Sequence, residues 1–352
     1  MITRLTWKPP ALDNPTTIQL TPTMTRILRL EAGKDYILQL PASEPLRIAL
    51  VVIGGRNIHM IGGEIAPDAF VAGSVETAAV RFYDQTGDVF VEGVKMRGQI
   101  TDGIHTKCKT ARIFIQNCWT EILLKGDPDV SGSAHSDWFQ SWGGVKEVYI
   151  DGWSGTTPYV ALGIHPEYDT FTDLVDVRRV SVKGLPESRY HLWMTKENGV
   201  IRLTDVYLDI PPERFERFGS QALAKSVWPD KDAAPPNNAT LHVDEATGRE
   251  YVDWLTSVSP KIEGRAWRGL PDGGHFVDPA KVGIGYVSPG YVGDSEPPPP
   301  PPPPSQSGLT EAQVQAIVDA RVAAKVAELM PALVEAARTQ VVEEIKARIA
   351  AL

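Results

Sequence analysis

Three aspartates, Asp102, Asp137 and Asp169, occupy the same position of a repeated sequence unit in the middle of the chain. Paired carboxyl groups of this kind act as general acid and general base on a glycosidic bond. At an effective dielectric constant of about 20, two carboxylates roughly 5 Å apart repel by about 3 kcal/mol, enough to raise one pKa by about two units. These three aspartates are therefore the candidate catalytic residues if the chain is an enzyme.

The same stretch of sequence is rich in histidine, tryptophan and amide side chains. Indole faces can stack on sugar rings, while imidazole and amide groups can hydrogen-bond sugar hydroxyls. The candidate ligand-binding residues are His105, His135, Trp138, Gln140, Trp142, His165, His191 and Trp193. A structural interpretation competes with both, because aspartates at turns cap neighbouring backbone amides. From the residues alone, the catalytic, binding and structural interpretations all stay open.

The repeated unit reads apolar, any residue, apolar, any residue, and then Gly, Asn or Asp. Its six copies begin at Ile58, Val89, Ile113, Val148, Val180 and Ile201. The residue nine positions before each start is also apolar, as Ala49, Val80, Ile104, Phe139, Phe171 and Leu192. Each unit fits a short strand that ends at a turn, and such units bury their inner faces by stacking. The constant offset predicts an all-β parallel β-helix solenoid and disfavours a β-sandwich, which imposes no such offset.

Three segments, residues 54–63, 102–105 and 148–152, resemble coils of right-handed parallel β-helices of the pectin-lyase-like superfamily. They read Gly-Gly-Arg-Asn-Ile-His-Met-Ile-Gly-Gly, Asp-Gly-Ile-His and Val-Tyr-Ile-Asp-Gly. Residues 30–36 resemble the strand that usually precedes those coils, and the resemblance covers roughly residues 20–212. Because the superfamily contains lyases, hydrolases and inert adhesins, the resemblance implies a fold and no single chemistry. The Asn-Thr-Asp, Asp-Asp, Gly-His-Gly and Arg-Ile-Lys signatures of its polygalacturonase-like members are incomplete here, which disfavours an enzyme.

Composition excludes several other classes of protein. The chain has 352 residues and a net charge of −9, which argues against a nucleic-acid-binding protein. It contains no run of 18 apolar residues that could insert into a membrane, and its N-terminus lacks the apolar core of a secretory signal. Two cysteines, Cys108 and Cys118, form neither a disulfide framework nor a zinc site by themselves. We expect no metal and no cofactor.

Changes in composition along the chain predict five segments. They are an N-terminal entry or cap segment (1–48), the parallel β-helix (49–212), a helix, hairpin and loop segment that packs on the solenoid (213–296), a polyproline linker (297–304) and a C-terminal α-helix (305–352). The unbroken prolines favour an extended spacer of roughly 3.1 Å per residue. The final helix carries apolar stripes that it cannot bury alone, so we expect it to form a homotrimer or to dock on another protein of a particle or on its own solenoid.

A parallel β-helix without a secretory signal, tethered to such a helix, resembles phage tailspikes and the spikes or fibres of virions and gene transfer agents. That resemblance implies a receptor-binding adhesin for a host cell-surface polysaccharide, made in the cytoplasm and displayed on a virion or phage-like particle. Two alternatives stay open, a polysaccharide depolymerase and a purely structural decoration protein. Whether the chain is an enzyme is therefore uncertain, although the incomplete signatures favour a non-enzyme.

Overall fold

The computed structural model describes residues 4–74, 76–125, 135–166, 170–188, 190–195, 198–228, 239–254 and 260–294. Those up to Gly293 belong to one compact unit. The predicted polyproline linker (297–304), the predicted C-terminal helix (305–352) and Asp169 lie outside the described residues.

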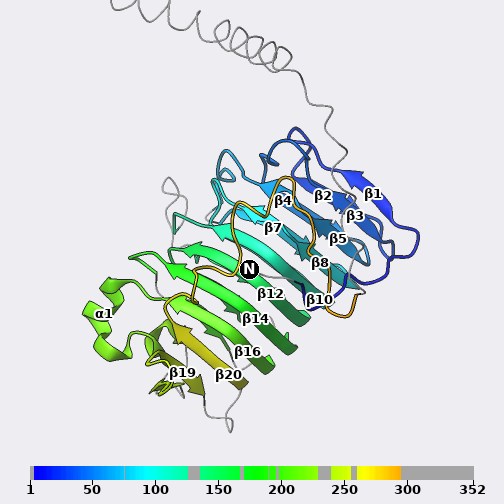
Figure 1. The fold of residues 1–352 in the computed structure, drawn as a ribbon. Helices are drawn as coiled ribbons and strands as arrows, with labels where there is room; N and C mark the ends of the chain where they lie inside the picture. The colour runs from blue at the N-terminus through cyan, green and yellow to red at the C-terminus, as the bar shows by residue number, and fades with distance from the viewer. Residues whose placement is uncertain are drawn as a thin grey trace, which may run out of the picture. The chain divides into compact units, whose positions relative to one another are not determined.

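Parallel strands stack side by side along most of the described chain, as Figure 1 shows. Each coil contributes a strand to a first ladder, which we call face 1. Face 1 contains β2 (Ile27–Leu30), β4 (Leu50–Gly54), β7 (Ala78–Tyr83), the start of β10 (Asp102–Glu121), β11 (Asp137–Gln140), β13 (Val160–Ile164), β15 (Leu192–Met194) and β17 (Val227–Trp228).

The second ladder is face 2. From β2 onward, each face 1 strand is followed in the chain by a face 2 strand. Face 2 contains β1 (Thr16–Gln19), β3 (Tyr36–Gln39), β5 (Ile58–Ile61), β8 (Asp88–Glu92), the middle of β10, β12 (Val145–Thr157), β14 (Thr172–Gly184), β16 (Asn198–Asp209) and β20 (Lys261–Arg268). The short strands β6 (Glu64–Ile65) and β9 (Lys95–Met96) form a third ladder, face 3, with the ends of the long strands. The mostly-β, parallel-stranded prediction is confirmed, and the stacking is consistent with a β-solenoid.

Each long strand bends from face 2 to face 3 at one residue with a left-handed backbone. These residues are Asn117 (φ 51°), Gly152 (φ 74°), Arg179 (φ 50°) and Asp205 (φ 54°). Glycine adopts such a conformation without steric cost, and Asn and Asp tolerate it better than most residues. At three of these four corners, the Gly, Asn or Asp that closes the repeated unit is therefore the residue that turns the coil.

The fifth copy of the repeat was predicted five residues too late. Val148 pairs with Val175, whereas Val180 pairs with Trp153 on face 3. Phe171, predicted to face the core, is 53% exposed, and Leu162 takes the position beside Phe139. In this coil, alternating valines occur both in the face 2 segment and in the face 3 segment of β14. The repeated pattern therefore fits either segment, and the sequence alone does not show which one lies on face 2.

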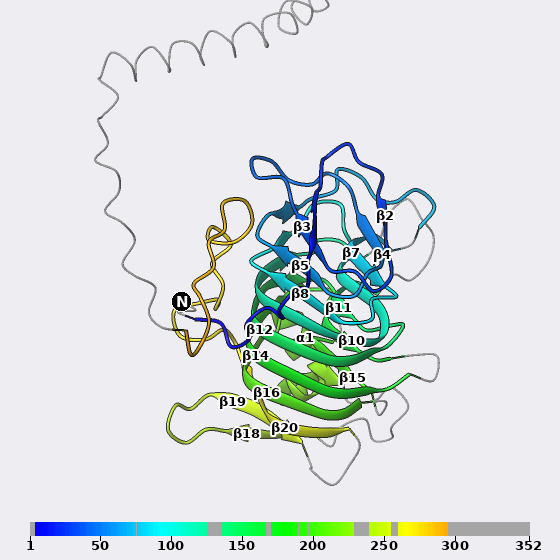
Figure 2. The same ribbon diagram turned by 90° about the vertical axis from the view of Figure 1, so that its right-hand side faces the viewer.

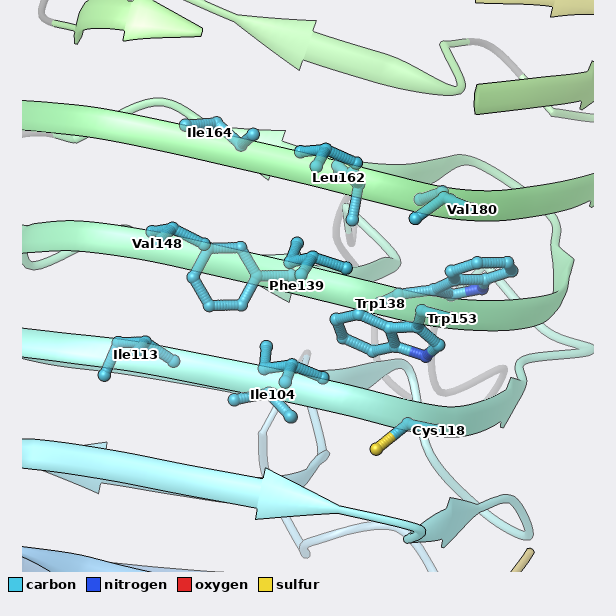
Figure 3. Packing of buried hydrophobic residues seen from close by; sticks show 14 of the residues in the cluster. Ile104, Ile113, Cys118, Trp138, Phe139, Val148, Trp153, Leu162, Ile164 and Val180 are labelled. Atoms are coloured by element: carbon cyan, nitrogen blue, oxygen red, sulfur yellow. The ribbon is translucent and has the colours of Figure 1, made fainter. Parts of the chain in front are cut away.

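The interior between the faces is apolar and continuous from coil to coil. Figure 3 shows Trp138 and Trp153 packed together beside Cys118 and Val180. The two indoles are fully buried, with ring centroids 5.9 Å apart. This packing overturns the prediction that Trp138 binds ligand, because its side chain is part of the core.

One end of the stack carries the few helical residues and an antiparallel hairpin. They are α1 (Pro212–Phe218), the 3-10 turns Gly219–Gln221 and Ala224–Ser226, and the strands β18 (Ala239–Val243) and β19 (Glu250–Trp254). Strand β19 also pairs antiparallel with β20. The helix expected within the 213–296 segment has only seven residues, because the chain turns at Gly219 (φ 56°).

Two segments from opposite ends of the described chain run along one side of the stack (Figure 2). Leu5 pairs with Tyr291, and the backbone of Gly283 donates to the carbonyl of Gly93 at 2.8 Å. Parallel pairing extends from β1 to β20, beyond residues 49–212 on both sides. Within the described ranges, no helix has the length and apolar character needed to cross a membrane.

Candidate functional site

A row of side-chain positions crosses face 1 from coil to coil. His105 pairs with Gln140, Gln140 with Gly163, and Gly163 with Trp193. The residues that precede them are all in the core: Ile104, Phe139, Leu162 and Leu192. Because successive side chains of a strand point to opposite faces of a sheet, the row lies on the outside of the stack. Three predicted binding residues thus lie in one row, with His105 and Gln140 on neighbouring strands and Trp193 two strands beyond Gln140.

Aromatic and imidazole rings gather at one end of this row. Trp193 stacks on His165, with centroids 4.3 Å apart, and its edge meets His135 at 5.7 Å. Tyr190 lies 6.3 Å from Trp193, and His135 stacks on Tyr159 at 5.3 Å. We call these five residues the ring cluster. It contains three predicted binding residues and leaves His135, Tyr190 and Trp193 partly exposed.

Polar and cationic groups flank the ring cluster. The amide of Gln140 lies 3.4 Å from Nε2 of His165, so the amide is positioned beside the rings. At the far end of the row, Trp142 lies 6.1 Å from His105, and Nζ of Lys107 lies 5.9 Å from the Trp142 ring. Lys125 lies 4.7 Å from the Tyr159 ring. The outer surface of face 1 therefore combines ring faces with positive charge.

Asp102 and Asp137 occupy neighbouring coils, as predicted, but both are fully buried. Oδ1 of Asp102 accepts a hydrogen bond from the backbone N–H of Asp137 at 3.0 Å. Burial, with the charge of Glu76 second, raises the pKa of Asp102 to about 8. Burial and the charge of Asp102 raise the pKa of Asp137 well above its usual range. Asp102 thus makes the backbone contact expected of a structural aspartate.

The aspartate ladder does not continue into the next coil. Asp137 pairs there with Val160, so the position predicted for Asp169 belongs to an apolar residue. The predicted ladder was wrong at this step because more residues separate β13 from the next face 2 strand, β14, than the constant sequence offset of nine assumes.

His191 lies away from the ring cluster, in the interior of the end that carries α1. Its side chain is fully buried, and burial, followed by the charge of Arg214, lowers its pKa to about 3. An added Cβ on Gly184 would collide with Nε2 of His191, which shows how closely the imidazole is packed. This position corrects the prediction that His191 contributes to an exposed binding surface.

Several residues of this surface were missed by the sequence analysis. Arg81 pairs with His105, so extending the row by one coil would have found it. Glu76, Tyr159 and Tyr190 come from segments outside the repeated unit, and no sequence signal placed them here.

A separate hollow of about 380 Å³ lies on face 2. Its lining includes Trp7, Arg112 and the stacked pair Phe114 and Tyr149, whose ring centroids are 4.7 Å apart. The backbone N–H of Trp7 donates to the Gln116 side chain at 3.0 Å, which fixes the N-terminal segment over this hollow. Phe114 and Tyr149 share one position of the repeat, a signal that the sequence analysis did not use.

Comparisons of the chain with protein-family models, with curated proteins and with solved structures give no significant match. The chemistry of the surface therefore has to be judged from its own residues. Partly exposed rings next to an amide suit the stacking and hydrogen bonding of a polyhydroxylated ligand. The two buried aspartates do not reach the surface on which such a ligand would lie.

Proposed function

We propose that this chain is a virion-type spike or fibre protein that binds a host cell-surface polysaccharide. The observation that carries the proposal is the ring cluster on the outside of face 1, with Gln140 beside it. Trp193 and Tyr190 offer flat apolar faces to sugar rings, and the partly exposed imidazole of His135 lies beside them as a hydrogen-bonding group for hydroxyls. Lys107 and Lys125 add positive charge, which favours an acidic polysaccharide.

The stacked parallel strands support a right-handed β-helix of the pectin-lyase-like kind as the scaffold. Such a stack is a rigid support on which a long polymer can contact several coils at once. In the same proposal, residues 297–304 are an extended linker, and residues 305–352 form a helix that makes a homotrimer or docks on another particle protein. The protein would then be displayed on a virion or phage-like particle.

A polysaccharide depolymerase is the second candidate, and one observation favours it. The pKa of Asp102, raised to about 8, gives a carboxyl group that is protonated at neutral pH, as a general acid must be. Complete burial of Asp102 and Asp137 argues against it, because a glycosidic bond needs direct contact with both groups. A structural decoration protein, the third candidate, would bind no glycan.

The test is to incubate the full-length protein with capsular polysaccharide and lipopolysaccharide extracts and to follow both retention and fragment release. We expect retention without new reducing or unsaturated ends. Fragment release that is abolished in Asp137→Ala would establish a depolymerase and overturn the proposal. Neither retention nor release with any extract would favour the structural role instead.

A further inference from the structure

Glu76, Asp102 and His105 bring three possible metal ligands together beside the row on face 1. One carboxylate oxygen from each acidic residue and one ring nitrogen of His105 lie within 4.8 Å of one another. Atoms that bind one zinc ion tetrahedrally at about 2.0–2.2 Å lie about 3.3–3.6 Å apart. Side-chain movements of about 1 Å would therefore bring all three donor atoms onto a single ion.

Two side chains at this place have polar atoms that the described residues do not satisfy. His105 is 5% exposed, and neither of its ring nitrogens has a hydrogen-bond partner among those residues. Asp137 is fully buried, and both of its carboxylate oxygens also lack a partner there. Buried polar side chains in proteins nearly always have a partner, and a bound ion is one way in which such groups are satisfied.

The charge at this place also points to a cation. The carboxyl groups of Glu76 and Asp102 have oxygens within 4.8 Å of each other, and the backbone N–H of Asp137 donates to Oδ1 of Asp102 at 3.0 Å. The guanidinium of Arg81 donates to the backbone carbonyl of Glu76 at 3.1 Å. Burying several like charges is costly unless further positive charge is present.

We propose that Glu76, Asp102 and His105 bind one divalent cation of the zinc class, with Asp137 completing its surroundings. An imidazole in the ligand set favours zinc and similar transition metals over calcium and magnesium, which prefer oxygen ligands. The ion would join the segment before β7, which carries Glu76, to β10, which carries the other two ligands. This inference does not depend on the proposed function, because the ion would serve the fold whether or not a glycan binds.

The experiment uses the full-length protein, stripped of metal with a chelator and then titrated with zinc chloride in a calorimeter. We expect one equivalent to bind and the unfolding temperature to rise with zinc concentration. Glu76→Gln and His105→Gln should each weaken zinc binding by roughly tenfold or more. The matched controls are Glu245→Gln and His242→Gln, two residues of the β18–β19 hairpin region, and both should bind zinc as the wild type does.

Cobalt chloride gives a second readout, because bound cobalt has a visible spectrum that reports its ligands. We expect this spectrum in the wild type and its loss in His105→Gln. The proposal is overturned if zinc binding does not saturate at one equivalent, if calcium chloride binds as tightly as zinc, or if the two variants bind zinc unchanged. Glu76→Gln decides the matter if His105→Gln does not fold, because Glu76 is only partly buried.

Discussion

His191 should make the folded chain less stable as the pH falls from 7 to 5. In the folded chain, burial first and Arg214 second lower the pKa of this imidazole to about 3, so it stays neutral over that range. In the unfolded chain it takes up a proton near its ordinary pKa of about 6.5. The unfolded state therefore binds more protons, and the free energy of unfolding falls with pH by about 2 kcal/mol between pH 7 and pH 5.

Urea unfolding at both pH values measures this contribution in the wild type, in His191→Gln and in the control His242→Gln. Other titrating groups act equally in all three proteins and cancel when the pH-dependent losses are compared. We expect the wild type to lose about 2 kcal/mol more than His191→Gln, because His191→Gln lacks this imidazole. His242 is the control because its side chain is about 39% exposed, whereas that of His191 is fully buried. Equal losses in the wild type and His191→Gln would refute a neutral buried imidazole at this position.

Three further predictions concern the core, one corner and the thiols. Trp153→Ala should lower the free energy of unfolding by about 3–5 kcal/mol, since the indole is fully buried. A decrease under about 1 kcal/mol, measured by urea unfolding, would contradict the packing. Gly93→Ala should loosen the segment that contains Tyr286, because Gly93 has φ 66° and a Cβ added to it would collide with the Tyr286 ring. Unchanged hydrogen exchange of the backbone amides around Tyr286 would contradict this contact. Burial raises the pKa of Cys108 and of Cys118 to about 12, so a thiol reagent should label both cysteines only after the chain unfolds. Rapid labelling of the folded chain would contradict their burial.

The corners of the coils could be predicted from sequence wherever the turning residue is Gly, Asn or Asp. Asn117, Gly152 and Asp205 all close a predicted unit and all have positive φ. The prediction failed at Arg179, a residue type that seldom adopts this conformation. Nε of Arg179 donates to Oδ1 of the buried Asp151 at 2.6 Å, a contact between coils that supports the corner and that no local pattern reveals.

Most of the row on face 1 could be predicted because the coils that carry His105, Gln140 and Trp193 keep the constant offset, whereas the coil of β13 does not. His105, Gln140 and Trp193 therefore share a face as expected. Trp138 could not be assigned correctly, because alternation alone does not reveal that its indole packs against Trp153 in the core. Glu76 lies outside the repeated unit. Sequence spacing there does not predict which strand the segment that carries Glu76 will contact.

The most direct test of the proposed function is polysaccharide binding by Trp193→Ala, compared with the wild type and with Trp267→Ala. Trp267 is the matched control because it is a partly buried indole that packs on Tyr207 and Tyr251, away from the ring cluster. We expect Trp193→Ala to weaken retention of the polysaccharide by roughly tenfold or more, as truncation of a central aromatic contact does, and Trp267→Ala to leave it unchanged. Equal retention by all three proteins, or release of fragments by the wild type, would contradict the account of face 1 as a binding surface.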